Sequence, residues 1–339
     1  TDEWLLPAHD DNRVTAQRAP PRKRLNFITV WYWLGLKGEP LQNGTARKTQ
    51  AKLIIFCIFS QPCAVFPRKF LPLLKLPKIL KSHERLLRSV VKHFDVNGNV
   101  ETIKPLGNGL INDTYIVKTE GDAPDYVLQR INHHIFTDVD TLMTNIQAVT
   151  SHIRKKLTLA GESDIDRKVL TFIPTTSDGK YYFFDGENYW RMMVFIPGAH
   201  TFEAVNPESS RNAGKAFGNF QAMLVDIDVD LKESIPDFHN MEFRLKQLHD
   251  AVEADPEGRV AEVKPILDEL EARAEEMTKA ERLYREGKLP KRICHCDTKV
   301  NNMMFDDNGN ILCVIDLDTV MPSFIFSDFG DFLRTGANK

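Results

Sequence analysis

The sequence predicts an α+β protein with two lobes: a small antiparallel β-rich lobe, and then a helical lobe. Short runs with strand character cluster between residues 100 and 196. Beyond Pro207 the apolar residues instead recur at three- and four-residue intervals, which is typical of helices. Because strands dominate the first part and helices the second, the order indicates segregated layers rather than a repeated unit.

The β-rich part contains six strand candidates and two amphipathic helices. Apolar residues recur at helical spacing over 86–94 and, with a 3-4 step, over 139–157, where Thr137 or Asp138 can cap the helix. The strand candidates are 100–105, 112–118, 126–131, 172–174, 180–185 and 189–196. Asn108-Gly109 lies between the first two of these and predicts a hairpin turn.

The helical part ends in short strands. Helical periodicity covers 213–224 and 260–270, and the last strand candidates are 292–295, 302–305 and 311–315. A turn over 306–310 joins the last two strands and predicts a late hairpin.

Charge divides the chain near residue 82. Residues 1–82 hold 14 Lys and Arg against 5 Asp and Glu, although the whole chain of 339 residues carries a formal net charge of −3. They show no sustained period of 2 or 3.6. We therefore interpret them as a poorly ordered basic extension outside the fold rather than a nucleic-acid-binding patch.

The five cysteines form no C-x-x-C pair, which favours reduced thiols in a cytoplasmic protein. Cys294 and Cys296 alternate at a strand end and are expected to point to opposite faces, so we predict no structural metal. The apolar run over 53–60 is too short to span a bilayer, and no membrane association is predicted. No obligate protein partner is inferred.

One constellation near the C-terminus carries chemistry. It consists of His295-Cys296-Asp297-Thr298-Lys299-Val300-Asn301-Asn302, and then Val314-Ile315-Asp316-Leu317-Asp318. An Asp, a Lys two residues on, an Asn five residues on and a later Asp suit phosphoryl transfer. This spacing resembles the catalytic core of kinase-like phosphotransferases.

Each residue type in the constellation has a chemical reason. The Asp297 carboxylate can accept the proton of an attacking hydroxyl, and Lys299 can neutralise charge on the transferred phosphoryl group. The oxygens of Asn302 and Asp316 suit Mg²⁺ that is bound mainly through nucleotide phosphates and water. Asp318 lies on the same strand face as Asp316 and is expected either to reach a second ion or to fix the loop.

Neighbouring residues are expected to support this site. His295 is expected to bond the loop backbone. The literal Asp328-Phe329-Gly330 lies 26 residues after Asn302, too far along to supply the first metal ligand. Asp328 and Asp331 are instead expected to cap a following helix and brace the loop.

Five residues are candidates for contact with the nucleotide. Gly107 and Gly109 could let the backbone approach phosphates, although a plain tight turn explains them as well. Phe195 and Ile196 join the two parts of the chain, where a hinge would offer backbone groups to adenine. Gln129 occupies the strand position at which many kinase-like folds place a phosphate-pairing Lys.

Longer motifs resemble the aminoglycoside-phosphotransferase-type kinases, and within that superfamily the N-acetylhexosamine 1-kinases. They are the constellation above, Ile315-Asp316-Leu317-Asp318-Thr319-Val320-Met321-Pro322, Asp328-Phe329-Gly330-Asp331, Gly107-Asn108-Gly109-Leu110-Ile111-Asn112-Asp113-Thr114-Tyr115, Tyr126-Val127-Leu128-Gln129-Arg130-Ile131-Asn132 and Ile173-Pro174-Thr175-Thr176-Ser177. The resemblance implies a bilobal protein-kinase-like fold, with a nucleotide-binding lobe and hinge over 83–198 and a catalytic lobe over 199–339.

The resemblance also implies an ATP- and Mg²⁺-dependent kinase that phosphorylates the anomeric hydroxyl of GlcNAc or GalNAc. Two features depart from the family: Cys296 stands where Asn is expected, and the helices that complete the catalytic lobe are expected to be missing after Lys339. Two alternatives stay open: another small-molecule kinase of this superfamily, acting on choline, methylthioribose or an aminoglycoside, or an inactive nucleotide-binding fragment.

Overall fold

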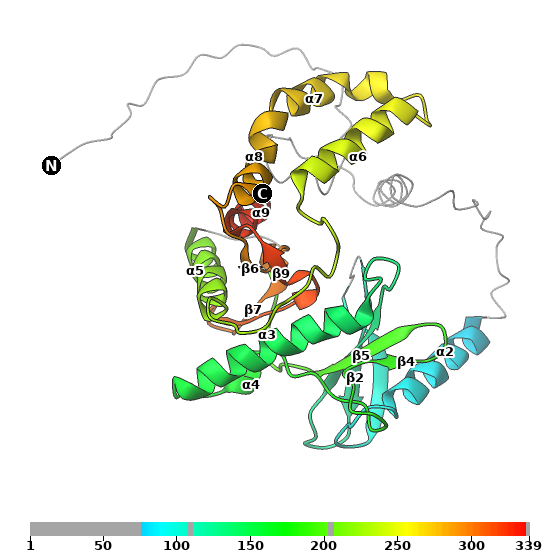
Figure 1. Ribbon diagram of the computed structural model, residues 1–339. Coiled ribbons are helices and arrows are strands. Elements are labelled where there is room, and N and C mark those ends of the chain that lie inside the picture. The colour runs from blue at the N-terminus through cyan, green and yellow to red at the C-terminus, as the bar shows by residue number, and fades with distance from the viewer. Residues whose placement is uncertain (1–75, 108–110, 203–206, 337–339) are drawn as a thin grey trace, which may run out of the picture.

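The computed structural model describes residues 76–107, 111–202 and 207–336, which form two lobes (Figure 1). The helices in these ranges are α2 Leu76–Val91, α3 Val139–Leu159, α4 Ile165–Lys168, α5 Pro207–Met223, α6 Met241–Ala254, α7 Val260–Ala272, α8 Ala274–Arg285 and α9 Ile325–Gly336. The strands are β1 Val100–Pro105, β2 Asp113–Thr119, β3 Tyr126–Ile131, β4 Phe183–Phe184, β5 Tyr189–Val194, β6 Arg292–Cys294, β7 Met303–Phe305, β8 Ile311–Val314 and β9 Met321–Ser323. Two 3-10 turns are η3 Val300–Asn302 and η4 Leu317–Thr319. Residues 1–75 of the predicted extension lie outside the described ranges, whereas α2 begins before the boundary expected near residue 82.

An antiparallel sheet forms the small lobe, with its described strands in the order β1-β2-β3-β5-β4. β1 and β2 pair as the predicted hairpin, although residues 108–110 of its turn lie outside the described residues. The strand predicted over 172–174 is wrong, because Phe172 forms only an isolated bridge with Met193. The strand predicted over 180–185 shortens to β4. The Asp178 carboxylate accepts hydrogen bonds from Thr175 Oγ1 at 2.5 Å and from Lys180 N at 3.2 Å. These bonds form a turn over 175–180, which competes with strand pairing at the start of the predicted strand.

The two faces of the sheet have different neighbours. Apolar side chains on one face, Leu128 and Trp190 among them, pack with Leu87 and Val90 of α2. Successive residues of a strand point to opposite faces, so the next positions along β3 and β5, Gln129 and Arg191, lie on the other face. That face is directed toward the second lobe, and it brings polar groups of the sheet to the interface.

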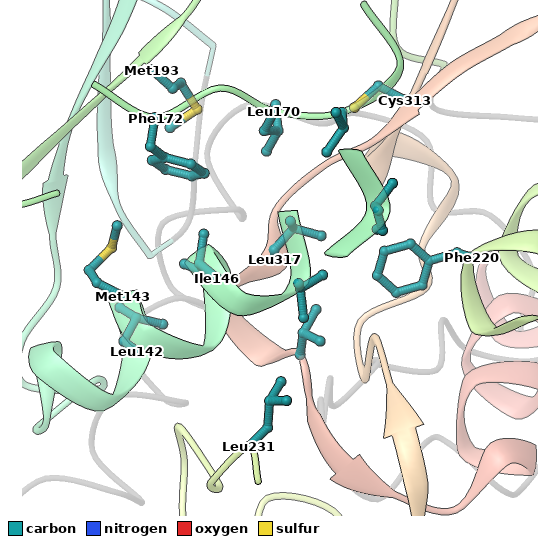
Figure 2. Packing of buried hydrophobic residues seen from close by; sticks show 14 of the residues in the cluster. Leu142, Met143, Ile146, Leu170, Phe172, Met193, Phe220, Leu231, Cys313 and Leu317 are labelled. Atoms are coloured by element: carbon teal, nitrogen blue, oxygen red, sulfur yellow. The ribbon is translucent and has the colours of Figure 1, made fainter. Parts of the chain in front are cut away.

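α3 connects the lobes through a shared core. Asp138 is its N-cap and accepts from Thr141 N at 2.9 Å, as one of the two predicted caps. Its stripe of buried side chains includes Leu142 and Ile146, each fully buried, which contributes about 2 kcal/mol per side chain. These residues pack near Phe172 of the small lobe and Leu317 of the second lobe (Figure 2).

The second lobe holds two small antiparallel pairs beside its helices. β7 pairs with β8 as the predicted late hairpin, with Met303 opposite Val314. β6 pairs with β9, which the sequence did not indicate because Pro322 interrupts so short a run. The predicted α+β class, an antiparallel β-rich lobe and then a helical lobe, is confirmed. No helix among the described residues is long and apolar enough to cross a membrane.

Candidate active site

The loop from β6 to η3 and the turn after β8 bring the predicted catalytic residues together. Ile315 N donates to Asn302 O at 2.9 Å, which places the residue after Ile315 beside η3. Lys299 Nζ lies 2.6 Å from Asp297 Oδ2 and 3.9 Å from Asp316 Oδ2. The structure therefore assembles Asp297, Lys299, Asn302 and Asp316 in one place at the face of the second lobe.

Hydrogen bonds orient the predicted base. Asn302 Nδ2 donates to Asp297 Oδ2 at 3.0 Å and to Asp297 O at 2.8 Å, and Lys299 binds the same Oδ2. Among the described residues no hydrogen bond reaches Asp297 Oδ1, and the side chain is 22% exposed. Two bonds to a single carboxylate oxygen thus fix the orientation of the Asp297 side chain.

The charged side chains of the site shift one another's pKa values. Burial, and then the Asp318 carboxylate, raises the pKa of Asp316 to about 6, although 41% of its side chain is exposed. Burial lowers the pKa of Lys299, but the carboxylates of Asp297 and Asp316 outweigh it and hold that pKa above 10.5. Lys299 therefore carries its charge at neutral pH.

The oxygens at this site fit a cation that uses few protein ligands. The described residues contain no group of three or more His, Cys, Asp or Glu that would hold a metal by themselves. Asn302 directs its amide nitrogen to Asp297, which leaves its Oδ1 available as a metal ligand. Mg²⁺ with nucleotide phosphates needs only one or two such ligands.

The Asp318 side chain makes its contacts with the small lobe and not with Asp297 or Lys299. Its carboxylate is buried, with Oδ1 2.5 Å from Arg191 Nη1 as a charge contact and Oδ2 3.0 Å from Arg191 Nη2. Asn112 Nδ2 donates to the same Oδ2 at 2.7 Å. The structure thus brings Asp318 to the small lobe rather than to Asp297.

Three of the residues predicted to contact the nucleotide already have partners within the protein. Gln129 Oε1 accepts from Arg191 Nε at 2.9 Å, and its Nε2 donates to Thr114 Oγ1 at 3.1 Å, so its side chain is tied within the sheet. Phe195 N donates to Asp125 O at 2.9 Å, and Ile196 is buried in the core.

The two candidate glycines lie at the β1–β2 turn. Gly107 has a φ of +69°, where a side chain is disfavoured. An added Cβ there would meet no atom within 4 Å, so the conformation rather than close packing requires the glycine. Gly109 lies outside the described residues.

Comparison with known proteins identifies the family. The family model of the phosphotransferase enzyme family matches residues 102–338. The chain belongs to this family. Among solved structures, a spectinomycin phosphotransferase is 14% identical, with a TM-score of 0.45 over 73% of this chain and 74% of that one. A choline kinase from Streptococcus pneumoniae is 16% identical, with a TM-score of 0.38 over 76% and 74%. A Plasmodium vivax ethanolamine kinase is 15% identical, with a TM-score of 0.36 over 84% and 72%.

In this phosphotransferase Asp328 holds the loop around Asp297 by hydrogen bonds to its neighbours. Its Oδ1 accepts from Cys296 N at 2.8 Å, and its Oδ2 accepts from His295 N at 2.9 Å and Gln221 Nε2 at 2.7 Å. Thr298 Oγ1 donates to Asp328 O at 2.5 Å. The bracing role predicted for Asp328 is confirmed.

The predicted capping role of Asp328 and Asp331 is wrong. α9 begins at Ile325, so both residues lie inside the helix rather than before it. Phe329 of the literal Asp-Phe-Gly is 64% exposed and points away from the site. His295 Nε2 bonds Ile315 O at 2.9 Å, as expected for a residue that fixes the loop backbone.

The two cysteines beside the base do not point to opposite faces, which corrects the sequence prediction. Cys294 and Cys296 pack in one buried cluster with Met321. Cys296 has a φ of +64°, so the chain leaves strand geometry there and the alternation ends. Burial raises the pKa of both thiols above 9.0, and they stay protonated at neutral pH.

His239 is a half-buried residue near the site that the sequence prediction missed. It lines a small cavity of about 10 Å³ together with Cys296, beneath the catalytic loop. Burial, and then the Arg244 charge, lower its pKa, the Asp297 carboxylate opposes both, and the resulting pKa is about 4. A lone His before Asn240 and Met241 gives no sequence signal for this environment.

We predict that acid destabilises the phosphotransferase partly through His239. Its pKa is about 4 in the folded protein and 6.5 when exposed. As the pH falls below 6.5, the unfolded chain therefore binds a proton that the folded chain does not. The free energy of unfolding should fall by about 2 kcal/mol from pH 7 to pH 5 through this residue alone.

Urea unfolding at the two pH values tests this prediction. His239→Leu should lose less stability on acidification than the wild type by that amount. His249→Leu, at an exposed histidine, should keep the wild-type pH dependence. An equal loss in wild type and His239→Leu would contradict the prediction.

Proposed function

We propose that this phosphotransferase moves the γ-phosphoryl group of ATP to the anomeric hydroxyl of an N-acetylhexosamine, GlcNAc or GalNAc. The observation that carries the proposal is the joint placement of Asp297, Lys299, Asn302 and Asp316. The sugar acceptor rests on the sequence over 297–302 and 315–322, which resembles the N-acetylhexosamine 1-kinases. Use of ATP suits a cytoplasmic protein, and so do the buried thiols of Cys294 and Cys313, which form no disulfide.

The geometry supports a separate role for each of these residues in the reaction. Asp297 Oδ1 takes the proton of the sugar hydroxyl as the oxygen attacks phosphorus. Lys299 and Asn302 hold Oδ2, so the base is oriented before the substrate arrives. Lys299 also lies between Asp297 and Asp316, where its charge can stabilise the transferred group.

Asn302 Oδ1 and Asp316 would hold Mg²⁺ in this reaction. The ion, when bound, neutralises charge on the nucleotide phosphates. These two residues follow β6 and β8, and the β7–β8 pairing together with the bond from Ile315 N to Asn302 O brings them close. The hairpin therefore sets the spacing of the two ligands.

An ADP-release assay with a panel of acceptors tests the proposal. GlcNAc or GalNAc should give a kcat/KM about a hundredfold above choline and an aminoglycoside. Phosphorus NMR should show a product with phosphate at the anomeric carbon. Turnover of choline or an aminoglycoside alone would replace the sugar proposal with another small-molecule kinase. Failure to bind ATP with Mg²⁺ would favour the inactive fragment.

A further inference from the structure

Arg191 is a buried cation that the transfer chemistry does not use. It lies on β5 opposite Gln129 and is 2% exposed. Its Nη1 and Nη2 lie 2.5 and 3.0 Å from the two carboxylate oxygens of Asp318. Its Nε donates to Gln129 Oε1, and its guanidinium lies 5.8 Å from the centre of the Phe172 ring. The planar fork of arginine suits such a two-oxygen contact, so the small lobe presents a fixed site for one carboxylate.

Asn112 provides a second contact from the small lobe. Its Nδ2 donates to Asp318 Oδ2 at 2.7 Å, while its Oδ1 accepts from Asn132 N at 3.0 Å. On the side of the second lobe, Ser234 Oγ donates to Asp318 O at 2.6 Å. Donors thus hold both the side chain and the main chain of Asp318.

The held residue belongs to the turn that carries Asp316. Asp316 directly precedes η4, which contains Asp318, and has a φ of +59°. Asp is one of the few non-glycine residues that tolerate this left-handed conformation, and here it turns the chain away from β8. With Asp318 drawn to the sheet, the turn leaves the Asp316 carboxylate partly exposed beside Lys299.

We propose that Arg191, acting through Asp318, is a positioning residue that ties the small lobe to the Asp316 turn. Asp318 then takes the loop-fixing one of its two predicted roles, because Arg191 and Asn112 already hold its carboxylate. The identity of the ion and the nucleotide rests on the proposed function. Groups that orient metal ligands typically change metal affinity by about 10–100-fold when they are removed.

Calorimetric titration of ADP into the full chain over a series of Mg²⁺ concentrations tests the proposal. Arg191→Met and Asp318→Asn should raise the Mg²⁺ concentration for half-maximal ADP binding by about tenfold. Arg191→Lys keeps the charge without the fork and should give a smaller shift. Asp316→Asn removes a ligand and should abolish the Mg²⁺ dependence. Turnover at saturating Mg²⁺ should fall less in the Arg191 variants than their Mg²⁺ affinity does.

Two further variants separate positioning from folding. Asn112→Ala removes one contact to Asp318 without leaving an unpaired charge, and should raise the Mg²⁺ requirement by about threefold with a native circular dichroism spectrum. Arg130→Met is the matched control, because Arg130 lies on β3 and pairs with Asp113 at the surface. It should keep the wild-type Mg²⁺ requirement.

Two results would overturn the proposal. One is a wild-type Mg²⁺ requirement in folded Asn112→Ala and Arg191→Lys. The other is a loss of Mg²⁺-dependent binding in Asp318→Asn as complete as in Asp316→Asn, which would make Asp318 a ligand itself. The titration contains no acceptor. If the acceptor panel shows another substrate class, the sugar proposal is wrong, but the Mg²⁺ requirement measured here is unaffected.

Discussion

Replacing Asp297 by Asn is expected to lower kcat by about a thousandfold, with ADP affinity within about twofold of the wild type. The amide has nearly the shape of the carboxylate and keeps an oxygen for Lys299 and Asn302, but it cannot accept the hydroxyl proton. The hydrogen bonds from Lys299 and Asn302 go to the Asp297 carboxylate and to its backbone oxygen, and the amide can keep them. Steady-state ADP release with the preferred acceptor measures kcat, and calorimetry measures the ADP affinity.

A matched carboxylate serves as the control for this variant. Asp307 lies in the turn between β7 and β8, and its side chain is 81% exposed beside His200. Asp307→Asn makes the same chemical change on the same hairpin and should keep wild-type turnover. Turnover within tenfold of the wild type in Asp297→Asn would remove Asp297 as the base. A loss of ADP binding in that variant would point to a damaged fold instead.

Local patterns were sufficient for the elements whose side chains alternate cleanly between core and solvent. The predicted bounds of β1 and β3 match the observed ones, and α3 follows its 3-4 step from Val139. In α3 the buried residues follow the helical period, and in β3 buried and half-buried residues alternate from Tyr126 to Gln129. The β7–β8 hairpin was accessible for the same reason, since its turn residues are strong local signals.

The proximity of the proposed catalytic residues was also predictable, because phosphoryl transfer needs these residue types close together. Asp297, Lys299 and Asn302 lie within six consecutive residues, so one loop can place them. The contacts that hold Asp318 are of another kind. Arg191 is 127 residues away from it and Asn112 is 206 residues away, distances over which no local pattern operates. A single arginine within the apolar strand Tyr189–Val194 was the available signal, because a buried charge needs a partner.

Backbone conformation at the site was the least accessible part of the structure. Cys296 and Asp316 both adopt positive φ, which side chains of this type signal weakly or not at all. At position 296 the resemblance leads one to expect Asn, a residue that tolerates this conformation better than Cys. The departure thus placed a thiol in a strained turn, and the assumption of strand alternation put it on the wrong face.

Replacing Asp328 by Ala is expected to lower the free energy of unfolding by about 3–5 kcal/mol. Asp328 is buried and accepts hydrogen bonds from His295 N, Cys296 N and Gln221 Nε2. Its removal leaves these donors without the acceptor they share, and each buried unsatisfied donor costs about 1–3 kcal/mol. The catalytic loop loses its support at the residues that precede Asp297. Urea unfolding at pH 7 measures the change.

Phe329→Ala is the control, because it truncates the next residue of the same helix at an exposed position. It should change the free energy of unfolding by about 0.5 kcal/mol or less. If both variants lost the same small amount, the three donors would have found other partners, and Asp328 would not brace the loop. A large loss in Asp328→Ala alone would show that the Asp of this Asp-Phe-Gly sequence supports the loop from inside α9, while its Phe faces solvent.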